Sequence, residues 1–328
     1  MNQLEQVIKL KDLLKRDYFR LFLILIPSFF AYLVNWIFTF EIHSESFNLY
    51  SKAYPILSLS QIIISYGGIQ VLSHRKIPRV NIYLLIFVSL YSTLFIPELA
   101  PYIILFSISE FVVLNQVINR NIINHFFWLL LLVLIRVTII YDISLSVYIS
   151  LGSIIFIFPK YINFNFFENP IKNFLNFSSL FSLFHIIILQ LPLILLEETK
   201  TVYINTIIYT GVIVVCNAWY KNIKLIDLQK FKKIDFINPI FLSFFLIFIF
   251  IFFEFSLMLL ISLFLKLFSI QSFIILTALK RKNIFILLPS IMSLIFLITF
   301  RDQLLTYIIY DSILIFYIFL NYFKIIKL

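Results

Sequence analysis

A succession of long apolar segments, separated by short polar connections, runs through the whole chain. Each approaches or exceeds the length, about 20 residues, that a helix needs to cross the hydrocarbon core of a bilayer. With 62% hydrophobic residues, the chain has too much apolar surface for a soluble domain. We therefore expect an all-α polytopic membrane protein. The twelve apolar segments are 21–40, 47–72, 81–97, 100–118, 123–141, 143–159, 176–196, 201–220, 237–253, 255–279, 283–300 and 303–323.

The basic residues predict how these segments are oriented. If both termini lie inside, Lys200 and Arg301 are in outer loops and Lys52, Arg136 and Lys266 lie within segments. All the others of the 26 Lys and Arg residues then fall on the inside, as loops on the cytoplasmic side of a membrane require. The net charge of +10 therefore reports topology, and no nucleic-acid partner is expected. The predicted location is a bacterial cytoplasmic (inner) membrane, with both termini cytoplasmic.

The spacing of the segments predicts two halves. Residues 1–20 form a basic amphipathic segment, and 21–159 form an N-terminal lobe of six helices. A cytoplasmic linker at 160–175 leads to a second lobe of six helices at 176–328. Cys216 is the single cysteine, so no disulfide framework or cysteine metal site is available.

A line of polar side chains interrupts the second segment. Ser51, Tyr54, Ser58, Gln61 and Ser65 follow helical spacing and fall within an arc of roughly 80°. This side of the helix therefore faces other helices or water inside the membrane. Two interpretations are open, namely small polar residues that bind packed helices together and the wall of a cavity.

A related line occurs in the eighth segment. A shift of 152 residues carries the first stripe onto Tyr203, Thr206, Thr210, Ile213 and Asn217, four of which are polar. Because each half has an even number of segments, the halves would be parallel repeats about an axis along the membrane normal. A stripe at the same place in both halves favours a shared central cavity.

At this point the chain resembles a family. Six plus six segments, with a second helix that opens ESFNLYSKAYPILSLSQIIISYGGIQVLS, resemble the polysaccharide (Wzx-type, O-antigen) flippases. These belong to the multidrug/oligosaccharidyl-lipid/polysaccharide exporter superfamily. The resemblance covers most of the chain as topology and segments one, two, seven and eight as sequence. It implies two facing lobes, alternating access and an undecaprenyl-pyrophosphate-linked oligosaccharide as cargo.

Ionisable residues at membrane depth are functional candidates because burying them is costly. Lys266 is interpreted either as a lysine paired with Asp311 or Glu110, or as a cation for a phosphate or an ion-coupled gate. Asp311 and Glu110 are candidates for ion coupling, or alternatively form packing hydrogen bonds as protonated acids.

Three further polar residues lie within the segments. His185 can titrate near neutral pH, although a lone histidine near Gln190 is more often a packing residue. Both are retained as candidate substrate contacts. Arg136 is predicted to extend towards Asp142 at the outer surface.

The sequence predicts a flippase for a lipid-linked oligosaccharide. No nucleophile–base pair, metal-ligand cluster or glycine-rich phosphate loop is recognisable, so we expect no catalytic residues, no metal and no cofactor. The alternatives are an oligosaccharide polymerase or acyltransferase of surface polysaccharide assembly, and a cation-coupled small-molecule exporter. Expected partners are the lipid-linked oligosaccharide and membrane lipid, and the polysaccharide polymerase machinery is a further partner that this function allows.

The charge pattern predicts which loops are accessible from each side. Cysteines placed at Ser44, Glu98 and Lys200 should react with an impermeant thiol reagent applied to sealed cells, whereas cysteines at Arg75 and Lys230 should react only after permeabilisation. Labelling at Lys230 in sealed cells would contradict the twelve-segment topology.

Overall fold

The computed structural model describes residues 17–37, 44–65, 80–118, 121–163, 177–196, 200–211, 256–278 and 287–325. Almost all of these residues are helical, which confirms the all-α class. The elements are α2 (Asp17–Ile37), α3 (Ser44–Ile64), β1 (Val80–Asn81), α5 (Ile82–Phe95), η2 (Pro97–Leu99), α6 (Ala100–Ile118), α7 (Ile122–Tyr141), α8 (Ile143–Tyr161), β2 (Ile162–Asn163), α10 (Phe177–Leu195), α13 (Leu257–Ala278), α14 (Leu288–Phe300) and α15 (Gln303–Ile325).

Each predicted apolar segment that falls on described residues coincides with a helix. Residues 200–211 form the described part of the eighth segment. The ninth segment, 237–253, lies outside the described residues, as do positions 1–16 of the N-terminal segment and 164–175 of the linker. Some helix boundaries follow from the sequence, because a polar residue with a capping side chain precedes the apolar segment. Asn81, for example, accepts a hydrogen bond from the backbone N–H of Tyr83 at the start of α5.

One short element was not expected. Val80 and Asn81 pair with Ile162 and Asn163 as a two-residue parallel ladder. This ladder joins the beginning of α5 to the end of α8. It therefore ties together two helices at one end of the N-terminal group.

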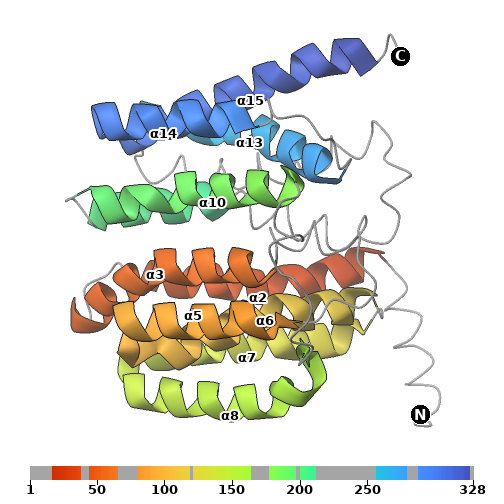
Figure 1. Cartoon of the computed structure of the whole chain (residues 1–328), viewed down its shortest axis with the longest axis vertical. Coiled ribbons are helices and arrows are strands. Elements are labelled where there is room, and N and C mark those ends of the chain that lie inside the picture. The colour runs from red at the N-terminus through yellow and green to blue at the C-terminus, as the bar shows by residue number, and fades with distance from the viewer. Residues whose placement is uncertain are drawn as a thin grey trace.

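The helices lie side by side across a single elongated array (Figure 1). Helices α2, α3 and α5–α8 form one group, and α10, α13, α14 and α15 form a second. Helices α3 and α10 pack against each other where the two groups meet. The start of α2 and the end of α15 lie at the same edge of the array (Figure 1).

The outer faces of the array are apolar. Leu94 is 81% exposed on α5, Phe156 is 87% exposed on α8 and Ile298 is 65% exposed on α14. Among the described helices, the stretch Ile123–Tyr141 alone is both long and apolar enough to qualify as a membrane span, and the other apolar stretches are shorter. The interior is mainly apolar too, but it also contains many buried polar side chains, among them Arg136, Lys266 and Asp311.

The two groups approach closely at one glycine. A Cβ atom added to Gly211 would lie 2.8 Å from Cε2 of Tyr32 on α2. Such a distance is shorter than any normal van der Waals contact, so the backbone of the eighth segment depends on glycine to reach this position. Tyr32 of α2 therefore contacts the eighth segment.

A pair of glycine substitutions tests this contact. Gly211→Ala should lower the free energy of unfolding by about 1–3 kcal/mol, because the Tyr32 ring has to move. Gly152→Ala on α8 is the matched control, since nothing lies within 4 Å of its added Cβ. The control should be neutral or stabilising by up to about 1 kcal/mol. Thermal unfolding of both variants in detergent measures the difference, and equal behaviour would contradict the close approach.

Candidate functional site

The first polar stripe runs along α3 at the boundary between the two groups. Ser51 donates to the carbonyl of Asn48 (3.1 Å), Ser58 donates to that of Tyr54 (3.0 Å), and Ser65 donates to that of Ile62 (3.4 Å). Each hydroxyl proton is thus used within the helix, whereas the oxygen retains lone pairs that can accept. The stripe therefore presents hydrogen-bond acceptors.

The second stripe is divided between two faces of the eighth segment. Tyr203 and Thr210 are seven residues apart, which is about two helical turns, so they share one face. Thr206 is rotated by about 60° from Tyr203 and by about 40° from Thr210. It is fully buried and bonds to Gln303 Nε2 (2.8 Å) and to the hydroxyl of Tyr307 (3.3 Å) on α15.

The structure therefore places Thr206 inside the C-terminal group instead of on the wall that faces α3. Asn217, the last residue predicted for this wall, lies outside the described residues.

The two stripes meet directly. The ring centroids of Tyr54 and Tyr203 are 5.7 Å apart, and those of Phe47 and Tyr203 are 5.4 Å apart with perpendicular rings. The Tyr54 side chain also interacts with that of Thr210. Edge-to-face aromatic pairs of this kind add roughly 0.5–1.5 kcal/mol each to packing. Residues of the second and eighth segments thus contact each other at the boundary between the two groups of helices. Gln61 is half-buried on the same helix, further along the stripe.

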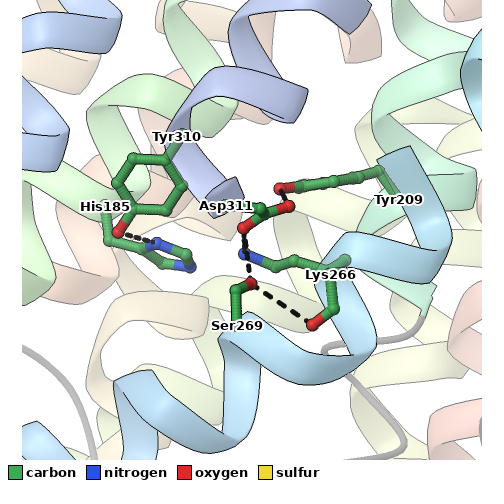
Figure 2. Close-up of polar contacts among 6 residues, drawn as sticks. All are labelled: His185, Tyr209, Lys266, Ser269, Tyr310 and Asp311. Carbon is green, nitrogen blue, oxygen red and sulfur yellow. Dashed lines mark hydrogen bonds and ion pairs between the residues drawn. The ribbon is translucent and has the colours of Figure 1, made fainter. Parts of the chain in front are cut away.

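A second polar cluster lies within the C-terminal group (Figure 2). Lys266 on α13 and Asp311 on α15 are fully buried, with Nζ and Oδ1 3.5 Å apart. Ser269 donates to the same Oδ1 at 2.5 Å, and Tyr209 donates to Oδ2. The Lys266 ammonium also lies 4.8 Å from the ring centroid of Tyr209. The carboxylate and the ammonium are therefore both compensated, as a buried ion pair requires.

His185 extends this cluster to α10. Its Nδ1 lies 2.7 Å from the hydroxyl of Tyr310, a neighbour of Asp311 on α15. His185 and Gln190 are both buried, at 3% and 2% exposed. The cluster thereby joins α10, α13, α15 and the eighth segment, and it places His185 in the interior of the group.

Of the pairings considered for Lys266, the one with Asp311 is present. Glu110 lies on α6, in the other group of helices, and its side chain is outside the described residues. Three partners, Tyr209, Ser269 and Tyr310, were not predicted. Ser269 is one helical turn from Lys266, and this spacing is a signal that the sequence contains. The contribution of Tyr209 depends on packing between distant segments, so the sequence carries no comparable signal for it.

The prediction for Arg136 was wrong. Its side chain is 7% exposed and turns inwards, where Nε donates to the hydroxyl of Tyr102 at 2.7 Å. Asp142 instead accepts from the backbone N–H of Leu145 at the start of α8. The aromatic residues of α6 stabilise the guanidinium in the interior. The ring face of Phe106 and the hydroxyl of Tyr102 provide contacts that water would provide at the surface.

No group of three or more His, Cys, Asp or Glu residues that could hold a metal ion occurs within the described ranges. Comparison with known proteins found no matching family model, no similar curated protein and no similar solved structure.

The buried ion pair gives a measurable prediction. Lys266→Met or Asp311→Asn alone should lower the free energy of unfolding by about 3–5 kcal/mol, because each leaves the other charge buried without its partner. The double variant should lose clearly less than the sum of the two. Thermal unfolding in detergent measures all three proteins.

The control for these two single variants and the double variant is Lys52→Met. Lys52 is exposed on α3, so the substitution should change stability by no more than about 0.5 kcal/mol. Strict additivity of the two single substitutions would show that Lys266 and Asp311 do not interact energetically.

Proposed function

We propose that this protein is a membrane flippase that moves a lipid-linked oligosaccharide from the inner to the outer leaflet. In this proposal the chain crosses the membrane twelve times, as two six-helix lobes related by a pseudo-two-fold axis along the membrane normal. Both termini face the cytoplasm. The cargo's lipid is a polyprenyl pyrophosphate, undecaprenyl pyrophosphate in the family that the sequence resembles.

The apolar exterior supports the membrane location. Large hydrophobic side chains are exposed along α5, α7, α8, α13 and α14. An exposed apolar surface of this extent would cause aggregation in water but suits contact with lipid. The long helices support it too, because α2, α3, α7, α13 and α15 contain 20–23 residues. At 1.5 Å per residue they match a hydrocarbon core of about 30 Å.

The observation that carries the proposal is the meeting of the two polar stripes between the two groups of helices. Tyr54 from the first half and Tyr203 and Thr210 from the second lie in contact there. A path between two lobes needs polar groups from both sides, since an unsatisfied polar group in hydrocarbon costs several kcal/mol. The direct contact of the aromatic residues corresponds to a state in which the lobes are closed at this level.

The chemistry of the stripes suits a sugar. The serine hydroxyls of α3 donate to their own helix and keep free lone pairs, so they can accept from sugar hydroxyls. Gln61 adds an amide, which can both donate and accept. The lipid tail can remain in the bilayer, so only the polar head has to pass between the lobes.

The buried Lys266–Asp311 pair has a different role in this proposal. The lysine is neutralised within its own group of helices, so it is not an uncompensated cation available to a pyrophosphate. The pair instead fixes α13 against α15, so that the second lobe can move as one body. Only a change of partner for Asp311 would release the lysine.

A genetic experiment tests the function. Deletion of the gene in its host should abolish surface polysaccharide and accumulate lipid-linked intermediates inside the cell. Loss of a polymerase would instead leave single repeat units exported. An unchanged polysaccharide in the deletion strain would overturn the proposal.

Three substitutions refine this test. Gln61→Leu and Asn217→Leu should fail to restore export while still inserting in the membrane, because they remove amides from the proposed path. Thr210→Val should reduce export several-fold by removing one hydroxyl from the junction. Thr299→Val on α14 is its matched control, because both threonines donate to the carbonyl four residues earlier and Thr299 is exposed on the outer face. Full complementation by all three stripe variants would show that the stripes do not form the path.

A further inference from the structure

Arg136 is a buried cation, and no acid among the described residues pairs with it. It lies on α7, and its guanidinium carbon is 4.6 Å from the ring centroid of Phe106 on α6. Within the part of the chain that the structure describes, one of its five N–H donors has a hydrogen-bond partner, because Nε donates to Tyr102. No carboxylate of the described residues forms an ion pair with it, and the nearest acid along the chain, Asp142, is exposed and caps α8.

The hydroxyl groups around Arg136 form a directed chain. Tyr102 accepts from Arg136 and is hydrogen-bonded to Tyr50 on α3, which in turn donates to Asn35 Oδ1 on α2 at 3.1 Å. Because each phenol has a single proton, the protons in this chain point away from the arginine. The chain fixes the orientation of the guanidinium but does not neutralise it.

A buried guanidinium that contacts only neutral groups is energetically costly unless an anion binds to it. Removing a charge from water costs several kcal/mol of hydration free energy. Neutral hydroxyls and one ring face compensate for only part of this cost. The terminal nitrogens of arginine form a planar fork that matches an oxyanion in a bidentate arrangement. The contrast with Lys266 is clear, because Lys266 has its own carboxylate and Arg136 has none among the described residues.

We propose that Arg136, oriented by Tyr102 and Phe106, binds a phosphoryl oxyanion within the N-terminal group of helices. Arg136 lies five residues before the end of α7 and Tyr102 lies two residues after the start of α6. In the proposed topology both positions are roughly 3–8 Å below the outer surface, at 1.5 Å per residue. The phosphates of lipid headgroups lie just outside the hydrocarbon core, so they are the oxyanions nearest to that depth. The outer location rests on the proposed function, whereas the anion site rests only on the contacts of Arg136.

A binding measurement on the purified full-length protein tests this site. Farnesyl pyrophosphate, inorganic pyrophosphate and nanodiscs that contain phosphatidylglycerol are the three probes. In neutral detergent, farnesyl pyrophosphate should bind the unmodified protein and raise its unfolding temperature. Arg136→Gln should weaken this binding by roughly ten- to a hundredfold, as expected for the loss of charge-assisted hydrogen bonds. Arg136→Lys should retain part of it, because the charge remains but the fork is lost.

Two further variants separate binding from folding. Tyr102→Phe keeps the guanidinium and removes only its orienting hydrogen bond, so binding should weaken by a few-fold. Lys52→Gln removes an exposed positive charge from α3 and should leave binding unchanged. If Arg136→Gln does not fold, a Tyr102→Phe variant that binds as tightly as the unmodified protein would overturn the proposal by itself.

The three probes also identify the source of the phosphate. Arg136-dependent binding of farnesyl pyrophosphate or inorganic pyrophosphate supports a pyrophosphate, and dependence seen only with phosphatidylglycerol supports a phospholipid headgroup. Equal binding of every probe by Arg136→Gln and the unmodified protein would overturn the site, as would the absence of any binding. If the site binds but the deletion strain exports normal polysaccharide, the anion site stands and the flippase proposal fails.

Discussion

A chain whose exterior is apolar has to satisfy its polar groups inside, and the rest of the structure depends on this constraint. Many of the described hydroxyls meet it in the simplest way, by donating to a carbonyl three or four residues earlier in their own helix. Ser107, Ser153 and Ser293 are examples. This local bond requires no contact with another helix, and the hydroxyl oxygen can still accept a hydrogen bond. Polar residues can therefore be placed on a helix without fixing which neighbour it packs against.

Other polar groups are satisfied only between helices, and these contacts determine how the helices pack. The carboxylate of Asp311 receives donors from α13 and from the eighth segment, so three helices are fixed by one residue. Tyr307 stacks on Tyr209 with ring centroids 4.1 Å apart and donates to the carbonyl of Leu189 on α10. In the N-terminal group, the hydroxyl chain from Arg136 to Asn35 has the same effect for α7, α6, α3 and α2. Each group thus has its own polar centre, and the junction between them is mainly aromatic.

This division explains how the proposed transport could occur within the fold. Helices held by internal polar networks resist separation, because breaking a buried pair is costly. The junction, in contrast, consists of edge-to-face rings and back-bonded hydroxyls, which can separate without leaving a charge unpaired. In the proposed function, cargo hydroxyls replace the contacts between the stripes when the lobes part. Gly211 allows the two groups to come together again, because it leaves room for the ring of Tyr32.

The sequence by itself determined the helices, since long apolar segments separated by short polar connections are typical of helices and too long for strands. It also determined that the stripes beginning at Ser51 and Tyr203 face the interior, because helical periodicity is a local property. The sequence allowed Lys266 to pair with Asp311 or Glu110 and suggested an outward path for Arg136. Only the tertiary structure selected Asp311, turned Arg136 inwards onto Tyr102 and moved Thr206 from the junction to α15. These choices depend on which helices are neighbours, and hydrophobic periodicity specifies the buried face of a helix but not the helix that covers it.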